Sequence, residues 1–465
     1  MAHCKIISHR HRRNLLWATA TLGCSDFGDR RRHLRAVRVL AQKATRPVEG
    51  ILQGSANPAS AKGSYRLLEN PSVNAGQFWD GIHHHTAKSL HGLDQVYVIQ
   101  DTTPLIFPGL FATVGLGTLG KAKEEALLMH SALAIRSDRQ VLGLLYSHVW
   151  ARPLEQFSTV EERESSPIEE KESREWLLGM ERVKQLRRQH GLRIQVVHII
   201  DRGGDVHEVF QKVLDEGDDC VIRSARNRRV AGPYHYLEET LAAQPPKDCY
   251  QIEVPRKHGE RKRRAEIELR STTVTFTPPG SRHGRLPISI NVVWVNEPNP
   301  PRGVKPLDWL LLTTLPVETV EECRRVVEIY KCRWVIEDFH FTLKSGCRIE
   351  ETQLKTAGRI EEYLALCCAV AVLILQLRNR ARTEPDVPCT LVLSDDEWKV
   401  LWAYTHGIPV AQAHSPPTMA QAVKLIGRLG GHLGRKGDGM PGVRTLWRGW
   451  SELQLLVEGF HLNGQ

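Results

Sequence analysis

The sequence lacks the cysteine spacings that hold zinc or build a disulfide scaffold. Its ten cysteines are scattered over 465 residues without a Cys-x2-Cys pair, a pattern that favours a reduced, intracellular protein. It also has little continuous hydrophobic sequence, because the longest apolar run, residues 364–375, falls short of the roughly 20 residues that span a bilayer. No charged segment leads into the apolar core of a signal peptide. These absences predict a soluble cytoplasmic protein without a membrane partner.

Two other features lack the parts that would make them sites. The glycine-rich segment 115–120 has neither the Gly-Lys-Ser/Thr ending nor the strand-to-helix setting of a phosphate loop, so nucleotide binding is not expected. The three consecutive histidines 83–85 cannot share one face of a helix or strand, so we do not expect them to bind one metal ion.

Positive charge is in moderate excess and is clustered. Lys and Arg number 63 against 53 Asp and Glu, which gives a net charge of +10. The densest basic stretches are residues 9–13, 30–38, 223–229 and 256–264. Clusters spread along a chain suit a polyanion that crosses several parts of the protein. Solubility alone explains the net charge but explains the clustering less well.

Two short runs rich in β-branched residues, 96–100 and 194–200, predict buried strands. Between them, residues 131–135 and 141–149 flank a turn and predict a hairpin, and the charged stretch 161–186 predicts a mostly helical segment. Strand, hairpin, helix, strand and a later acidic helix form the order expected of an α/β protein with a ribonuclease-H-like core.

A long segment separates the second strand from the acidic helix, too long for an ordinary connection. Alternation at residues 251–254, 265–270 and 288–295 predicts strands there, and hence a β-rich insertion at about 225–315. We expect three domains: a helical N-terminal domain at 1–75, a catalytic domain at 76–355 and a helical C-terminal domain at 356–465.

The N-terminal domain has a basic helical face. Asp29 is suited to cap a helix. The apolar side of that helix comprises Leu34, Val37, Leu40 and Ala41, and its basic side comprises Arg31, Arg35 and Arg38. Tyr65 and Arg66 belong to a second helix, which should stop before Pro71. Such a face can simply be solvated, but beside a nuclease-like core we favour DNA as its partner.

Three acidic residues stand in positions that suit metal-dependent phosphoryl transfer. Asp101 and Asp201 each end a predicted buried strand, which holds a carboxylate rigidly at the rim of a cleft. Glu337 lies on the predicted helix 330–344, whose same face carries Tyr330, Arg333 and Lys344. Acidic ligands beside phosphate-facing cations are what a two-metal site requires. A solvated stripe of charge pairs is the alternative for the helix taken alone.

These residues carry a resemblance to a known family. The motifs are Ile99-Gln-Asp101-Thr-Thr, the segment Ile200–His207 that begins Ile-Asp-Arg-Gly-Gly-Asp, and Tyr330-x2-Arg333-x3-Glu337-x6-Lys344. With them the chain resembles the bacterial DDE cut-and-paste transposases of the insertion-sequence-four type, and among these the Tn-five transposases. The likeness extends over nearly the whole chain, and the four-residue helix motif is its most specific part.

The resemblance implies a set of roles. Asp101 and Asp201 would share one Mg²⁺ and Glu337 would help to hold a second, with Mn²⁺ able to substitute. The residues that would contact DNA are Tyr330, Arg333, Lys344, Trp309, Arg223, Arg31, Arg35, Tyr65 and Arg66. Trp309 would support a base flipped from the duplex, although a core tryptophan is the alternative for that residue. Asp205 and His207 would lie next to the metal ligands.

The resemblance also implies the reaction and its partners. The protein would bind inverted repeats at transposon ends, excise the element through nicking, hairpin formation and hairpin opening, and join the 3′ ends to target DNA. It would act as a homodimer on DNA in the bacterial nucleoid, and apolar residues of the C-terminal segment with Trp447 and Trp450 would contribute to pairing. The alternatives are a catalytically silent relative that only binds terminal repeats, and another ribonuclease-H-like nuclease or resolvase.

Overall fold

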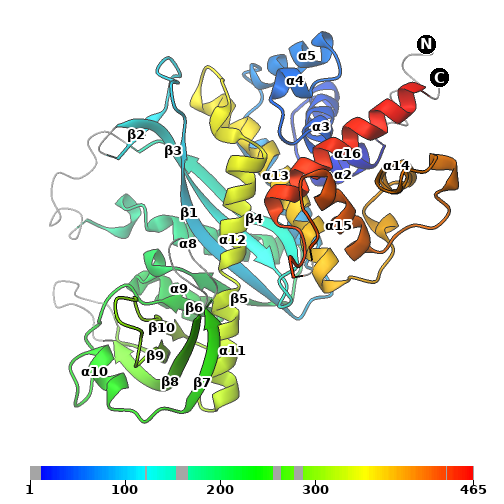
Figure 1. Ribbon diagram of the computed structural model, residues 1–465. Helices are drawn as coiled ribbons and strands as arrows, with labels where there is room; N and C mark the ends of the chain where they lie inside the picture. Colours follow the sequence, from blue (N-terminus) through cyan, green and yellow to red (C-terminus); the bar gives the residue numbers. More distant parts are fainter. Residues whose placement is uncertain are drawn as a thin grey trace.

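The computed structural model describes residues 12–120, 123–152, 166–254, 263–276, 286–435 and 437–463. A ten-stranded mixed sheet runs through the molecule in the order β2-β3-β1-β5-β6-β10-β9-β8-β7, with β4 paired to β3 (Figure 1). The strands are β1 Gln95–Ile106, β2 Gly117–Leu119, β3 Glu124–Ile135, β4 Val141–Trp150, β5 Gln195–Ile200, β6 Asp219–Arg223, β7 Asp248–Val254, β8 Arg263–Phe276, β9 Ile288–Asn296 and β10 Asp308–Thr313.

Helices surround this sheet. They are α2 Arg12–Thr21, α3 Arg30–Thr45, α4 Ile51–Gly54, α5 Pro58–Leu68, α6 Ala75–Lys88, α8 Arg174–Gln189, α9 His207–Glu216, α10 Leu237–Ala242, α11 Val320–Lys331, α12 Trp334–Phe341, α13 Ala357–Thr383, α14 Asp395–His406, α15 Met419–Leu429 and α16 Val443–Asn463. The predicted basic stretches at 9–13 and 256–264, and the first part of the charged stretch 161–186, lie largely or partly outside the described residues.

One half of the sheet has the predicted ribonuclease-H-like arrangement. Strand β1 pairs in parallel with β5, and β5 in parallel with β6, while β3 and β4 form the expected antiparallel hairpin. The central residues of the parallel strands, 96–99 in β1, 196–200 in β5 and 220–222 in β6, are buried and mostly apolar, as expected of strands covered on both faces. The α/β fold class predicted from the order of elements is confirmed.

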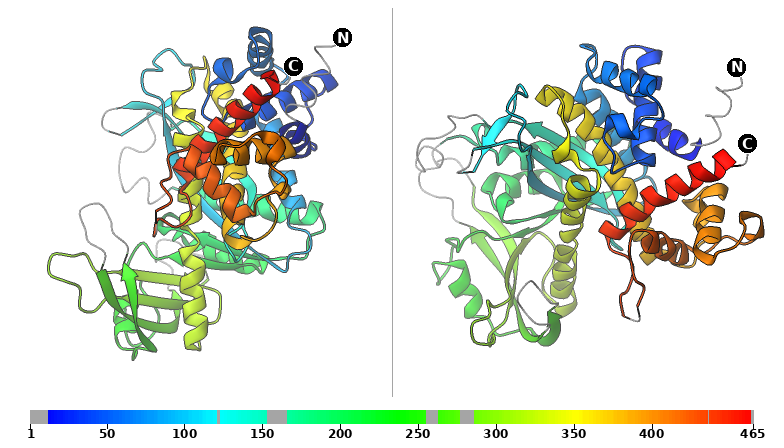
Figure 2. Two further views of the ribbon diagram at one scale, coloured as in Figure 1. Left: turned by 45° about the vertical axis from the view of Figure 1, so that its right-hand side comes forward. Right: turned by 45° about the horizontal axis from the view of Figure 1, so that its top comes forward.

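The insertion strands continue this sheet. Strand β10 pairs antiparallel with β6, and β9, β8 and β7 follow in turn. The strands predicted inside 251–254, 265–270 and 288–295 are present, but they do not form a separate sheet. Pairing with β10 satisfies the backbone groups that β6 would otherwise expose at an edge. In two further views the β7–β10 part and the terminal helices lie at opposite ends of the molecule (Figure 2).

The single helix predicted at 330–344 is interrupted, and that prediction was wrong in detail. Helix α11 ends at Lys331 and α12 begins at Trp334, and the junction is bridged by tighter i→i+3 hydrogen bonds, among them Arg333 N to Tyr330 O at 3.0 Å. A π-helical turn, Thr342–Gly346, follows α12. The break lets α11 pack on β6, β9 and β10 while α12 packs on β1 and α13.

Helix α13 is the central helix of the second half of the chain. Its most apolar window has a mean hydropathy of 1.9, so by length and composition alone it could cross a membrane. However, 83% of that window is buried inside the protein, against α3, α6, α15, α16 and β4. Helix α13 extends beyond both ends of the apolar run 364–375, and it is a core helix, as the length of that run predicted.

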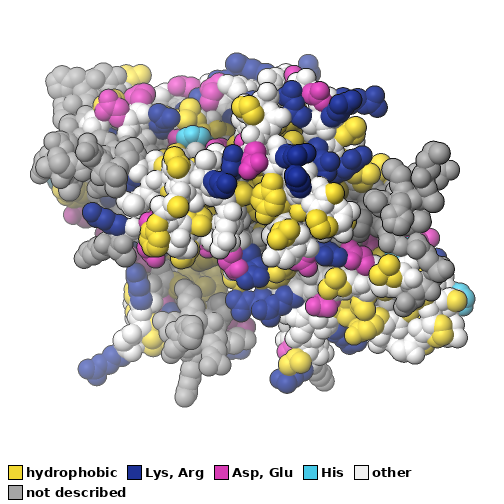
Figure 3. All heavy atoms as spheres, turned by 90° about the horizontal axis from the view of Figure 1, so that it is seen from above, with side chains coloured by type: hydrophobic (Ala, Val, Ile, Leu, Met, Phe, Trp, Pro, Cys, Tyr) yellow, Lys and Arg dark blue, Asp and Glu magenta, His cyan; other side chains and the backbone are white. Residues whose placement is uncertain are grey.

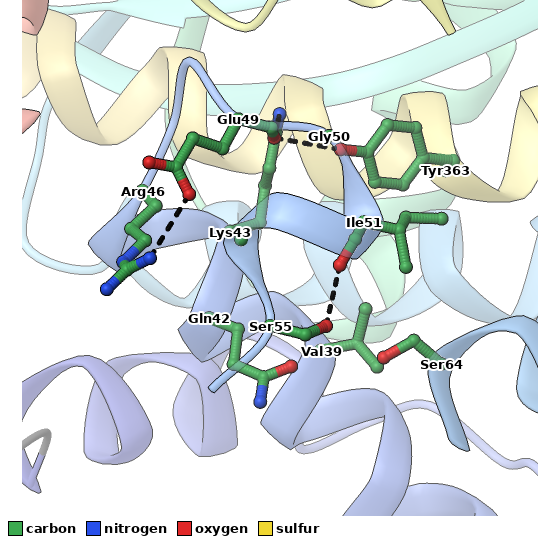
Figure 4. A pocket seen from close by; sticks show the side chains of 11 residues that line it. Val39, Gln42, Lys43, Arg46, Glu49, Gly50, Ile51, Ser55, Ser64 and Tyr363 are labelled. Carbon is green, nitrogen blue, oxygen red and sulfur yellow. Dashed lines mark hydrogen bonds and ion pairs between the residues drawn. The ribbon is translucent and has the colours of Figure 1, made fainter. Parts of the chain in front are cut away.

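The N-terminal helices pack on α13 and on the C-terminal helices. Within the predicted apolar side of α3, Val37, Leu40 and Ala41 are buried, but Leu34 is 43% exposed, so its assignment to the core was wrong. Lys43 is buried beneath α4, where Nζ donates to the carbonyl oxygens of Glu49 (2.9 Å) and Cys347 (3.1 Å) (Figure 4). It therefore ties α3 to the segment that follows the π-helical turn.

The C-terminal tryptophans are core residues. Trp447 and Trp450 are buried, Trp447 packs against Phe341, and Trp450 Nε1 donates to Ala44 O at 3.0 Å. The idea that these two rings form part of a pairing surface was wrong, because their area is already covered within the protomer. Ion pairs from Arg13 to Glu397 and from Arg46 to Glu458 add to the same contact between terminal parts.

Candidate active site

Asp101 and Asp201 lie side by side on parallel strands. Gln100 pairs in register with Ile200, so the next residue on each strand is an aspartate, and neighbouring strands lie about 4.8 Å apart. Asp201 follows the end of β5 as predicted. Asp101 does not end its strand, because β1 continues to Ile106. Beyond Asp101, β1 pairs only with β3, so the sheet loses its β5 neighbour at the position of the carboxylate.

Helix α12 carries Glu337 close to Asp101. Ligand atoms of Asp101, Glu337 and His340 all lie within 4.8 Å of one another, and they form the group of potential metal ligands that the described residues provide. Asp201 lies outside that group, and its Oδ1 accepts a hydrogen bond from Gly203 N at 2.8 Å. Asp201 is nevertheless close enough to act electrostatically on Asp101.

Burial and like charge shape the electrostatics of the site. Burial, followed by the negative charge of Asp201, raises the pKa of Asp101 from 3.8 to about 7, against the opposing effect of Arg333. The guanidinium Nη1 of Arg333 lies 3.6 Å from Asp101 and 3.1 Å from Glu337. Two carboxylates therefore share one arginine while Asp201 adds a third negative charge near Asp101, an arrangement that leaves negative charge incompletely neutralised and favours a bound cation.

An aromatic and cationic group borders the carboxylates. The rings of Trp309 and Tyr330 meet edge to face with centroids 5.4 Å apart. Arg223 Nη2 donates to Asp308 O at 2.8 Å, and burial lowers the pKa of its guanidinium. Tyr330 is buried, and burial raises its pKa, so its hydroxyl stays protonated. The structure thus brings together Trp309, Tyr330 and Arg223, which are distant in the sequence.

Lys344 lies on the π-helical turn beyond α12. Its Nζ is 3.9 Å from Glu350, and burial lowers its pKa while the charges of Glu350 and Glu337 oppose that effect. Lys344 therefore lies close enough to Glu337 for their charges to interact, although α12 ends before it and the π-helical turn carries it.

The N-terminal DNA-contact candidates form a separate group on α3 and α5, away from the carboxylates (Figure 1). Arg31 and Arg66 are exposed, whereas Arg35 and Tyr65 are half-buried. A side chain at Gly63 would place a Cβ 2.6 Å from Cζ of Arg35, so this glycine lets the guanidinium lie across α5. Viewed from above, Lys and Arg side chains are spread over much of the surface, with fewer acidic groups between them (Figure 3).

Asp205 does not join the metal ligands. Its buried carboxylate accepts hydrogen bonds from Arg228 Nε (2.9 Å) and Ala225 N (2.8 Å). It fixes the chain segment that leaves β6 after Arg223. His207 is buried and begins α9. Arg228 pairs with the carboxylate of Asp205, and the expectation that Asp205 and His207 lie next to the metal ligands stays a prediction.

His340 was not among the residues expected from the sequence. A signal was present, because Glu337 and His340 are three residues apart on a helix, the Glu-x-x-His spacing that places both side chains on one face and recurs at metal sites in helical proteins. The three histidines 83–85, by contrast, do not form such a group with any carboxylates in the part of the chain described.

Comparison with known protein families agrees with this geometry. Residues 15–73 match the family described as transposase DNA-binding, residues 180–373 match the transposase DDE domain, and residues 369–463 match the transposase Tn5 dimerisation domain. The three matches follow one another along the chain and together cover most of it. The chain therefore belongs to the Tn5-like DDE transposases, DNA-binding and dimer-forming enzymes whose DDE domain uses divalent metal ions.

Proposed function

We propose that this transposase excises a DNA element bounded by inverted repeats and joins its 3′ ends to target DNA. Water nicks one strand at the element's end, and the freed 3′-hydroxyl attacks the opposite strand to form a hairpin. Water then opens the hairpin, and the 3′-hydroxyl attacks target DNA. The observation that carries the proposal is the carboxylate pair of Asp101 and Glu337, gathered within 4.8 Å, near Asp201 and beside the cationic side chains of Arg333 and Lys344.

The donor set fits two Mg²⁺ ions, for which Mn²⁺ can substitute. Asp101 lies near both Asp201 on the neighbouring strand and Glu337 on α12, so it could serve both ions. Burial and the charge of Asp201 raise its pKa, and a bound cation would oppose that effect. Carboxylate oxygens are the ligands that Mg²⁺ prefers. When bound, two such ions activate the attacking water or hydroxyl and stabilise the leaving 3′-oxygen.

Arg333 has a second role in this proposal. Without a cation, its guanidinium partly neutralises Asp101 and Glu337. Positive charge bound between those carboxylates would release the guanidinium toward the substrate phosphate, which it can hold with two hydrogen bonds. Lys344 lies on the same side and would contact a neighbouring phosphate.

Trp309 would support the hairpin step. It is half-buried on β10, and one edge of its ring system packs against Tyr330. Stacking of a base on an aromatic ring is worth about 1–3 kcal/mol, which offsets much of the cost of unstacking it. Arg223, fixed by Asp308 O, would hold the phosphate beside that base.

We propose that recognition of the ends and chemistry belong to different parts of a dimer. Arg31, Arg35, Tyr65 and Arg66 would bind the inverted repeat through the helical domain at 1–75. The domain at 76–355 would cut the end held by the other protomer, and the domain at 356–465 would pair the protomers. The enzyme would work in the cytoplasm on nucleoid DNA.

Cleavage and binding assays on the same preparations test the proposal. With a plasmid that bears the element's ends and Mg²⁺, Asp201→Ala and Glu337→Ala should lose nicking to below detection yet retain binding in gel shifts. Asp338→Asn is the matched control, since Asp338 adjoins Glu337 but pairs with Arg378 at 2.7 Å. A wild-type protein that binds ends without nicking them would instead be a silent relative, and nicking by Asp201→Ala would refute the assigned site.

A further inference from the structure

We propose that His340 is a nitrogen ligand of the cation held between Asp101 and Glu337. The inference rests on the proposed function of that site and adds a ligand that the DDE carboxylates do not include. The cation between Asp101 and Glu337 would then have two oxygen ligands and one nitrogen ligand from the protein.

The geometry is the first argument. A ring nitrogen of His340 lies within 4.8 Å of carboxylate oxygens of both Asp101 and Glu337, so a cation at the middle of the three would lie within reach of all of them after small rotations. Glu337 and His340 occupy positions i and i+3 of α12, and Asp101 approaches from β1. Two rigid elements therefore supply the three donors.

The hydrogen bonding of His340 is the second argument. The residue is 5% exposed, and its buried Nε2 has no hydrogen-bond partner among the residues that the structure describes. Buried polar atoms rarely lack a partner, so this nitrogen is available to a ligand such as a cation. The neighbouring buried histidine His130 differs, because Nδ1 contacts Thr102 Oγ1 at 2.7 Å and Nε2 contacts Gln100 Oε1 at 3.0 Å.

Another buried histidine, His83, shows that an unpaired Nε2 alone does not identify a metal ligand. His83 also leaves Nε2 without a partner, but its ring stacks on Trp79, and it forms no ligand group with carboxylates among the described residues. His340 combines an unpaired ring nitrogen with the proximity of its ring to two carboxylates, and this combination points to a cation.

A nitrogen ligand has consequences for metal selectivity. Mg²⁺ prefers oxygen donors. An imidazole nitrogen binds Mn²⁺ more tightly than it binds Mg²⁺, and it binds Co²⁺ more tightly than it binds Mn²⁺. Removal of His340 should therefore weaken Mn²⁺ binding by at least about tenfold and weaken Mg²⁺ binding less, since even neighbours of metal ligands contribute about 10- to 100-fold to affinity.

Pulsed electron paramagnetic resonance of Mn²⁺ bound to the full-length protein, without DNA, tests the ligand directly. Wild-type protein should show nitrogen coupling to Mn²⁺, and incorporation of ¹⁵N-histidine should replace the ¹⁴N pattern with that of ¹⁵N. His340→Gln should lose the coupling. His148→Gln is the matched control, because His148 bonds to Glu175 at 2.9 Å outside the ligand group, and it should retain the coupling.

The outcomes separate this inference from the proposed function. Wild-type Mn²⁺ binding without nitrogen coupling would overturn the role of His340 and leave the carboxylate site intact, and this result needs no variant to fold. Unchanged Mn²⁺ affinity in His340→Gln would overturn it as well. Mn²⁺ binding that survives Asp101→Asn combined with Glu337→Gln would instead refute the carboxylate site, and the role of His340 with it.

Discussion

Asp101→Asn should stabilise the protein in the absence of divalent metal while it abolishes nicking. The carboxylate of Asp101 is buried beside Asp201 and Glu337, and its pKa is raised from 3.8 to about 7. Asparagine has nearly the same shape but carries no charge, so it removes the repulsion without leaving a cavity. The substitution therefore separates the electrostatic cost of the site from its chemistry.

The pKa sets the size and sign of the effect. Between pH 3.8 and about 7 the folded state holds a proton on Asp101 that the unfolded state has released, so wild-type stability falls as pH rises through this window and is level above it. The difference between the two pKa values corresponds to about 4 kcal/mol. The variant should therefore be more stable by up to about 4 kcal/mol at pH 8 and by less than about 2 kcal/mol at pH 5.

Thermal unfolding in a chelator at pH 5 and pH 8 is the assay. For 465 residues that unfold together, 4 kcal/mol corresponds to a rise in Tm of about 4 °C, and to more if the catalytic part unfolds alone. Saturating Mg²⁺ should raise the Tm of wild-type protein and raise that of the variant less. If the Tm of Asp101→Asn exceeded that of wild type equally at both pH values, or did not exceed it at pH 8, the ionised carboxylate would not be what destabilises the metal-free site.

Three further predictions concern DNA. Trp309→Ala should slow hairpin formation more than first-strand nicking in a gel that resolves both products; equal slowing, or unfolding, would identify a core tryptophan. Arg31→Ala, Arg35→Ala or Arg66→Ala should weaken end binding and lower its salt slope by about one unit per lost phosphate contact; unchanged affinity in all three would move recognition elsewhere. A mixture of Glu337→Ala and Arg66→Ala proteins should cut ends that neither cuts alone; efficient cutting by a monomer on one end would exclude action in trans.

The sequence by itself determined the local chemistry. Short β-branched runs predicted the strands that lead to Asp101 and Asp201, and both strands are present because such residues suit buried parallel strands. The alternation that predicted the insertion strands depends only on neighbours two residues apart, so it too was readable. The family motifs named Tyr330, Arg333, Glu337 and Lys344. Helix α11 carries Tyr330, and α12 with its flanking residues carries the other three.

The tertiary structure decided what local patterns do not encode. No local rule states that β10 joins β6, that Trp447 and Trp450 are covered by residues more than a hundred positions away, or that α11 breaks before Trp334, because these follow from packing between distant segments. Burial and neighbouring charge likewise set the pKa of Asp101, the pairing of Asp205 with Arg228, and the unpaired nitrogen of His340. A sequence specifies which groups are available; the fold fixes their distances and removes their water, and the energies of charged groups depend on both.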